Sequence, residues 1–250
     1  MVENTLKDLS NGQIVSDAQF QNFVNGSAVV EAIDWKKWTN KDCVVTDLDL
    51  PNESKGKFAR TIEHILTDEE CKALVEATEK IGYEPALVNI GNGKQILDID
   101  YRKNSRVIVD SVPVTDIIWE RLKPYLPDIF PKQKFIGGWN PHVLNERLRF
   151  LRYGPGDFFK GHMDGTFRKR ANETTDGLEH VSKVTLQLYL NEGFKGGATT
   201  FLGKPELPCV PKTGMALIFQ HDIHHEGSLL EKGTKYAVRT DLMYVRKPEE

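Results

Sequence analysis

The chain has 250 residues, of which 39% are hydrophobic and 28% charged, a balance typical of a folded globular protein with a full core. Its 33 Lys and Arg against 36 Asp and Glu give a formal net charge of −3 at pH 7. Such a near-neutral charge argues against nucleic acid or an anionic membrane surface as a partner.

The three cysteines and the start of the chain bear on its compartment. Cys43, Cys71 and Cys209 lie far apart and form no CxxC pair. This pattern excludes a disulfide framework and a thiolate zinc site, and it favours a reducing compartment. The first residues lack the basic and apolar regions of a signal peptide, and no stretch reaches the roughly 18 apolar residues that span a bilayer. The sequence therefore predicts a cytoplasmic protein without a membrane partner.

In chain order, the first segment carries no motif that can be assigned. Residues 1–57 are polar with scattered aromatic side chains, and we expect an N-terminal extension of unknown role packed on the main domain. Residues 58–250 are expected to form that main domain. Within it, helical support is predicted over 58–130 and a strand-rich core over about 146–246.

Two helices are predicted in the support region. A capping box at Thr67 and Glu70 opens the first helix, and Gly82 gives it a plausible C-terminal stop. The second helix is predicted over about 114–122, ending before Pro124. Two helices followed by strands indicate a helical layer that covers a sheet.

From about residue 146 the pattern changes to short strands separated by turns. The expected strands occupy residues 148–153, 184–190, 196–202, 215–220 and 236–245. This spacing indicates a sandwich or barrel, and with the helices it predicts an α+β, mainly β fold.

A candidate metal site follows the first of these strands. His162 and Asp164 are two residues apart, so on an extended chain they project to the same face. A third ligand is available from the histidine-rich segment 221–225 (HDIHH). Two histidines and one carboxylate on one face of an ion, with other positions open, is the arrangement of non-haem Fe(II) oxygenases.

The region from about 146 to 246 resembles the Fe(II)- and 2-oxoglutarate-dependent dioxygenases, in the branch related to prolyl 4-hydroxylases. The motifs that carry the resemblance are RYGPG at 152–156, HMD at 162–164, YLN at 189–191, GGATTF at 196–201, PKTG at 211–214, HEG at 225–227 and GTKY at 233–236. The resemblance implies a double-stranded β-helix (jelly roll). It also implies Fe(II), O2 and 2-oxoglutarate as co-substrate, with ascorbate as an optional accessory.

The resemblance also singles out one histidine of the cluster. In the family, Gly or a small residue comes two positions after the distal histidine, and a cation follows about ten positions after it. His225 fits both conditions, with Gly227 and Lys235, whereas His221 and His224 are expected to be supporting or strand-edge residues. The implied catalytic metal ligands are thus His162, Asp164 and His225. His64, His142 and His180 show no partner pattern and are expected to be structural or surface residues.

A second cation competes with Lys235 for the distal carboxylate of 2-oxoglutarate. The last strand alternates, and its polar face (Lys235, Ala237, Arg239 and Asp241) is predicted to look into the barrel. The prolyl hydroxylase spacing favours Lys235, while a spacing of about fourteen residues, found elsewhere in the superfamily, matches Arg239. Both stay open. The resemblance adds Tyr153 and Tyr189 as further 2-oxoglutarate contacts. Thr199 is either a further polar contact or simply the start of a strand.

Candidate substrate residues come from two polar stretches. Arg102, Asn104 and Arg106 lie upstream, in a region near the substrate mouth of the resembling enzymes. Arg168 begins a basic run in the long segment 165–182, beside the HxD motif.

The predicted reaction hydroxylates an unactivated C–H bond while 2-oxoglutarate is decarboxylated to succinate. The substrate is either a prolyl or other peptidyl residue, or a free amino acid or small metabolite. Two alternatives use other chemistry. One is a zinc hydrolase with Glu226 as its general base, and the other is a non-catalytic binding protein on a jelly roll.

Overall fold

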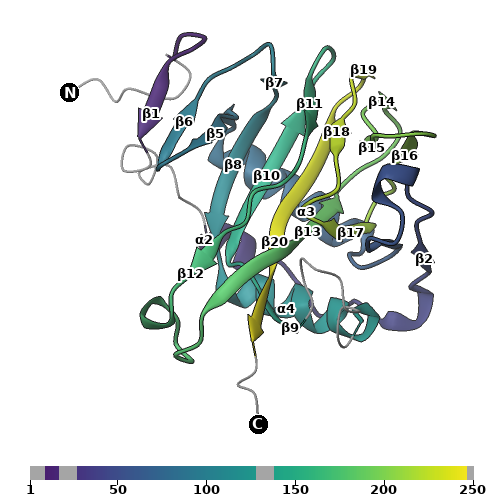
Figure 1. Cartoon of the computed structure of the whole chain (residues 1–250). Coiled ribbons are helices and arrows are strands. Elements are labelled where there is room, and N and C mark those ends of the chain that lie inside the picture. Colours follow the sequence, from purple (N-terminus) through teal and green to yellow (C-terminus); the bar gives the residue numbers. More distant parts are fainter. Residues whose placement is uncertain (1–8, 17–26, 128–137, 247–250) are drawn as a thin grey trace.

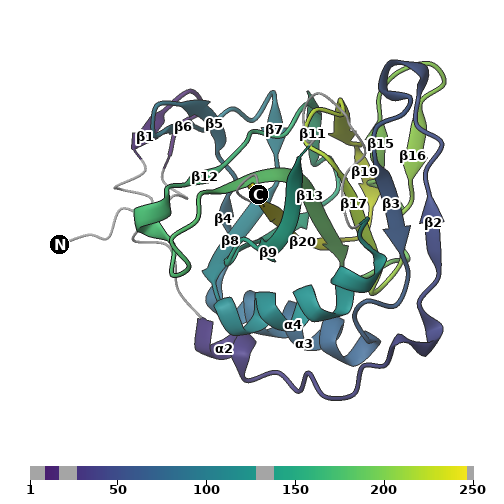
Figure 2. The ribbon, with the colours of Figure 1, turned by 60° about the horizontal axis from the view of Figure 1, so that its bottom comes forward.

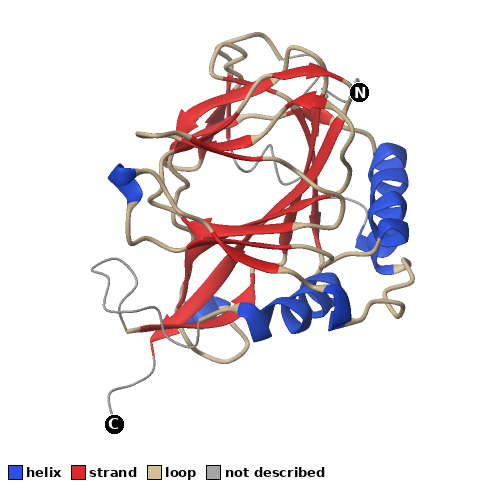
Figure 3. Cartoon of the chain, turned by 90° about the vertical axis from the view of Figure 1, so that its right-hand side faces the viewer, coloured by secondary structure: helices blue, strands red, loops and turns tan. Residues whose placement is uncertain are grey.

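The computed structural model describes residues 9–16, 27–127 and 138–246, and two facing antiparallel sheets form its centre (Figure 1, Figure 3). The main path of the larger sheet, in spatial order, is β2 (Val45–Asp47), β3 (Ala59–Ile62), β17 (Ala216–Gln220), β13 (His180–Tyr189), β20 (Lys235–Arg246), β10 (Arg147–Tyr153), β8 (Ser105–Asp110) and β4 (Glu84–Pro85). Off this path, β9 (Trp139–Leu144) pairs with β20 and β12 (Arg168–Lys169) pairs with β13.

The smaller sheet carries two of the three predicted metal ligands, His162 and His225. Its order is β16 (Leu207–Cys209), β15 (Thr199–Phe201), β18 (His225–Gly227), β11 (Phe158–His162) and β7 (Arg102–Lys103). A further small sheet joins β1 (Ile14–Ser16), β6 (Lys94–Ile96) and β5 (Val88–Gly91), and β14 (Lys195–Gly196) pairs with β19 (Leu230–Lys232). The mainly β prediction is confirmed.

Helices cover the outer face of the larger sheet, as Figure 2 shows. They are α2 (Ser27–Glu31), α3 (Asp68–Ile81) and α4 (Val112–Leu122), with short 3₁₀ turns at Asn40–Asp42, Asn52–Ser54, Lys123–Tyr125 and Ala171–Glu173. Both predicted helices are confirmed, including the capping box of α3. Helix α4 begins two residues earlier than expected because the Ser111 hydroxyl accepts a hydrogen bond from the Val114 N–H, and Pro113 suits a first helical turn.

The strand β20 separates the hydrophobic core from the interior of the barrel. Val238 and Leu242 pack in the large apolar core with the helices, while Lys235, Arg239 and Asp241 line a cavity between the sheets. The predicted orientation of the last strand is therefore confirmed. Because side chains alternate along a strand, one twelve-residue segment supplies both core packing and cavity lining.

One predicted strand is interrupted. The segment 196–202 contains the end of β14 and the separate strand β15, because Gly196 and Gly197 adopt φ angles of 79° and 68° that glycine tolerates and other residues rarely do. A Cβ on Gly196 would lie 2.3 Å from the carbonyl oxygen of Leu229, so the close approach of the two segments also requires glycine.

The described parts of residues 1–57 lie against the rest of the chain. β1 pairs with β6, β2 pairs with β3, and Val30 of α2 is in the large apolar core. The domain boundary at residue 57 stays a prediction. Among the described residues, no helix is long and apolar enough to cross a membrane.

A buried ion pair joins the two main helices. Arg121 of α4 contacts both carboxylate oxygens of Glu70 in α3 at 2.7 Å, and the two residues are 3% and 1% exposed. We expect Arg121→Met to lower the free energy of unfolding by about 3–5 kcal/mol, because it leaves the Glu70 carboxylate buried without its cation. Lys212→Met is the matched control, since it breaks the exposed pair with Glu63 and should cost under about 1 kcal/mol. Urea denaturation measures both free energies of unfolding, and an equal decrease in the two variants would contradict this account.

Candidate active site

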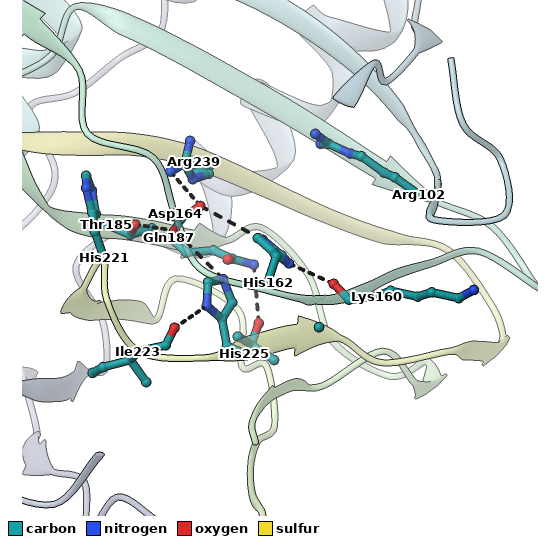
Figure 4. Close-up of polar contacts among 12 residues, drawn as sticks. Arg102, Lys160, His162, Asp164, Thr185, Gln187, His221, Ile223, His225 and Arg239 are labelled. Carbon is teal, nitrogen blue, oxygen red and sulfur yellow. Dashed lines mark hydrogen bonds and ion pairs between the residues drawn. The ribbon is translucent and has the colours of Figure 1, made fainter. Parts of the chain in front are cut away.

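The end of one strand and the start of its neighbour bring the predicted metal ligands together (Figure 4). His162 is the last residue of β11, Asp164 follows it, and His225 is the first residue of β18. β11 and β18 are antiparallel neighbours in which His162 is paired directly with His225. Facing residues on such strands lie about 5 Å apart, which places both imidazoles beside the Asp164 carboxylate.

The donor atoms of the three residues converge on one point. The Nε2 atom of His162 lies 3.9 Å from Oδ1 of Asp164, and Nε2 of His225 lies 3.7 Å from Oδ2. The three ligand atoms are all within 4.8 Å of one another. In each ring Nδ1 donates a hydrogen bond to a backbone carbonyl, of Lys160 at 2.8 Å and of Ile223 at 2.9 Å. These bonds fix the tautomer that leaves an Nε2 lone pair for a metal.

The charges of these residues suit a divalent cation. Burial lowers the pKa of His162 to about 3, with a further contribution from His225, and burial also lowers the pKa of His225. Burial alone would raise the pKa of Asp164, but Arg239 and the imidazoles outweigh it and hold this pKa below its ordinary range. Two neutral imidazoles and one carboxylate are the ionisation states that a metal requires. The residues present therefore fit a 2-His-1-carboxylate metal centre.

A polar network holds the Asp164 carboxylate in place. The Thr185 hydroxyl donates to Oδ2 at 2.5 Å, and Nη2 of Arg239 lies 2.8 Å from Oδ1. Arg239 also contacts Asp241 at 3.2 Å, and the buried His221 places Nε2 3.4 Å from the same carboxylate oxygen. The backbone carbonyl of His221 accepts a hydrogen bond from the Asp164 N–H at 2.9 Å. His221 thus supports the site rather than joining the ligand set, as expected.

The ligand cluster faces a cavity of about 860 Å³ between the two sheets. Of the residues predicted to touch metal, co-substrate or substrate, most line it: His162, Asp164, His225, Lys235, Arg239, Tyr153, Thr199, Arg102 and Arg106. The cavity is therefore large enough for 2-oxoglutarate together with part of a second molecule.

Lys235 is a buried cation in this cavity. It is 2% exposed, its Nζ donates to the Gly197 carbonyl at 2.6 Å, and it lies over the rings of Tyr153 and Tyr189 at 5.2 and 5.4 Å. Within the described part of the chain, no carboxylate forms a salt bridge with it, whereas Arg239 is shared between two aspartates. Burial lowers the pKa of Lys235 to about 8. An incoming carboxylate would supply the counter-charge that this ammonium group lacks.

The other predicted co-substrate residues surround Lys235. Tyr153 and Thr199 line the cavity, and the fully buried Tyr189 donates its hydroxyl to Thr199 Oγ1 at 2.8 Å. Tyr189 itself does not line the cavity, so it orients the Thr199 hydroxyl. Gln187, which sequence reasoning missed, also lines the cavity and lies 3.5 Å from Thr199. Its place on the inward face of β13, two residues before Tyr189, was the available signal.

The predicted substrate residues divide into two groups. Arg102 and Arg106 line the cavity, and Asn104 is buried and accepts a hydrogen bond from Arg102 Nε at 2.8 Å. Arg168 lies elsewhere. Its guanidinium group is exposed and pairs with Glu179 at 2.6 Å, outside the cavity lining.

A family model described as the 2OG-Fe(II) oxygenase superfamily matches residues 148–240, the segment that contains every predicted metal and co-substrate residue. Over this segment the chain is similar to the 2OG-Fe(II) oxygenase superfamily. This match favours the oxygenase prediction over the zinc hydrolase and the binding protein. No curated protein matches the sequence.

Solved structures of prolyl hydroxylases share the fold. A viral collagen prolyl hydroxylase from Paramecium bursaria Chlorella virus-1, in a 2OG complex, is 20% identical with a TM-score of 0.51, and the match covers 75% of this chain and 97% of that one. A prolyl hydroxylase from Trichoplax adhaerens, in complex with a hypoxia inducible factor peptide fragment, is 14% identical with a TM-score of 0.53, covering 75% and 83%. The predicted jelly roll with supporting helices, of the prolyl hydroxylase type, is thereby confirmed.

Proposed function

We propose that this oxygenase hydroxylates an unactivated C–H bond of its substrate, with 2-oxoglutarate and O2 converted to succinate and CO2. One oxygen atom enters the product hydroxyl group and the other enters succinate, so the reaction is balanced. The observation that carries the proposal is one cavity that holds a 2-His-1-carboxylate cluster and, separately, a buried lysine that forms no salt bridge with any carboxylate of the described residues.

In this proposal the cluster and the lysine bind opposite ends of 2-oxoglutarate. His162, Asp164 and His225 would hold Fe(II), which supplies the redox chemistry with O2. Lys235 would pair with the distal carboxylate of 2-oxoglutarate in a charge-assisted contact, and the Thr199 hydroxyl lies in the same cavity to add a hydrogen bond. Arg239 would keep the Asp164 carboxylate oriented through the 2.8 Å contact. Ascorbate would act only as an accessory.

For the substrate, we propose a prolyl or other peptidyl residue, and a carboxylate-bearing small molecule is the second candidate. The prolyl hydroxylase fold supports the first. The second is favoured by Arg102, which stacks over the Phe159 ring at 4.5 Å and forms no salt bridge among the described residues. Both candidates place the reacting group between Arg102 and the metal ligands.

Arg102→Leu tests whether this arginine contacts substrate. We expect the variant to raise the substrate KM by at least about tenfold, since a hydrogen bond to a charged group contributes about 1.5–3 kcal/mol. The KM for 2-oxoglutarate should change less than about twofold. Kinetics with Arg168→Leu, whose side chain lies outside the cavity, provide the control. Equal changes of both KM values in Arg102→Leu would contradict a substrate role.

The pKa of Lys235 gives the proposal a pH dependence. With a pKa of about 8 the lysine is charged below that pH and neutral above it, and only the charged form attracts a carboxylate. The Kd for 2-oxoglutarate should therefore stay flat up to about pH 8 and then rise up to about tenfold per pH unit. Calorimetry on wild type and Lys235→Arg shows whether deprotonation of the lysine causes this rise in Kd. Arginine stays charged over this pH range, so the Kd of the variant should not depend on pH. A flat wild-type curve to about pH 9.5 would oppose this account.

Succinate formation tests the proposed reaction. Purified protein with Fe(II), 2-oxoglutarate and O2 should release succinate, and a true substrate should increase that rate and gain 16 Da. Proline-containing peptides and free amino acids form the two arms of the screen. His162→Ala, prepared in the same way, should release no succinate above background. Succinate release by this variant at the wild-type rate would overturn the assignment of the site.

A further inference from the structure

A second group of metal-ligating side chains lies outside the cavity. Nε2 of His142 lies 2.7 Å from Oδ2 of Asp176, and Nε2 of His180 lies 2.9 Å from the same oxygen and 3.1 Å from Oδ1. The three ligand atoms are within 4.8 Å of one another. None of these residues lines the cavity that contains His162 and Asp164. His142 and His180, for which the sequence shows no partner pattern, thus share Asp176 as a common partner.

The strands around β20 build this cluster. β9 and β13 both pair with the last third of β20, on its opposite sides. Val143 faces Met243 and Pro141 faces Tyr244, so His142 is the extra residue of a β-bulge. Bulges commonly turn a side chain toward a site. His180 begins β13, and its ring lies 4.9 Å from that of His142 at an interplanar angle of 71°.

The ligand atoms and their exposure suit a divalent ion of intermediate hardness, such as zinc. Two imidazoles and one carboxylate are common ligands of zinc, which often completes a four-coordinate shell with water. The side chains of His142 and Asp176 are 33% and 31% exposed, and that of His180 is 11% exposed. The cluster is thus anchored on one side and open to solvent on the other, which gives an ion an entry path and room for a water ligand.

We propose that His142, Asp176 and His180 form a second metal site, for a divalent cation of the zinc class, separate from the Fe(II) site. An ion bound there would also hold one end of a loop in place. Asp176 and His180 lie at the far end of the segment whose beginning, at Gly165, Thr166 and Phe167, lines the cavity. A metal at this second site would fasten the end of that segment to β9.

Zinc stoichiometry tests the second site without any enzymatic readout. Metal-free protein is dialysed against buffered Zn²⁺ and its bound zinc is measured by mass spectrometry. Since the described residues contain two candidate clusters, we expect two equivalents for wild type and one for Asp176→Asn. His162→Ala should also bind one, so the double variant should bind none. His224→Ala, an exposed histidine outside both clusters, is the matched control and should bind two.

Two results would overturn the second site. One is a single equivalent in wild type that His162→Ala removes, and the other is two equivalents retained by Asp176→Asn. His142→Ala gives an independent measurement at a partly exposed position if Asp176→Asn folds poorly. The outcomes separate this proposal from the Fe(II) site, because each site is removed by its own variant.

Discussion

His225→Ala should abolish turnover, whereas His224→Ala should leave it within about twofold of wild type. The two residues are adjacent in the sequence, but His225 is 5% exposed with Nε2 beside the Asp164 carboxylate, and His224 is exposed. Loss of an outer partner of a metal ligand typically costs 10–100-fold, so loss of a direct ligand should exceed about 100-fold.

Iron content and succinate release measure this pair together. His225→Ala should retain little Fe(II) after gel filtration under anaerobic conditions, while His224→Ala retains one equivalent at the site. Circular dichroism confirms that both variants fold. If His224→Ala lost the iron and His225→Ala kept it, the assignment of the third ligand would be wrong.

Lys235→Ala should raise the KM for 2-oxoglutarate by at least about 30-fold. Removing one member of a buried charge pair costs about 2–5 kcal/mol, and 1.4 kcal/mol corresponds to tenfold. Lys235 is the expected partner of the distal carboxylate because it is buried in the cavity and no carboxylate of the described chain neutralises it. Lys232→Ala, at an exposed lysine at the end of β19, is the matched control and should leave the KM unchanged.

Arg239 is the competing cation, and its variant should behave differently. Arg239 contacts Asp164 at 2.8 Å and Asp241 at 3.2 Å, so Arg239→Leu should weaken Fe(II) binding by about 10–100-fold. At saturating iron its KM for 2-oxoglutarate should change only a few-fold. The reverse pattern, with a large increase of KM in Arg239→Leu and none in Lys235→Ala, would show that Arg239 binds the distal carboxylate.

The sequence predicted elements well wherever local signals were strong. The capping box at Thr67 and the alternation along β20 rest on near neighbours, and both appear in the structure as expected. The break between β14 and β15 was missed because two glycines with positive φ look like an ordinary strand start. Strand alternation shows which face a residue takes, but it does not show where backbone conformation interrupts pairing.

Contacts between distant segments were harder to predict. The Asp241–Arg239–Asp164 network depends on how β20 lies beside the loop after β11, and no spacing in the sequence encodes that distance. The cluster of His142, Asp176 and His180 arises because two strands flank β20 and one of them carries a bulge. Such register details follow from tertiary pairing, so sequence patterns leave them open.

The most direct test of the oxygenase site is an anaerobic titration of the protein with Fe(II) and 2-oxoglutarate, followed by visible absorbance. We expect the weak charge-transfer band of the Fe(II)–2-oxoglutarate chelate in wild type, no band in His162→Ala, and a need for much more 2-oxoglutarate to reach the band in Lys235→Ala. Folded, iron-loaded wild-type protein that shows no band at any 2-oxoglutarate concentration would contradict the account.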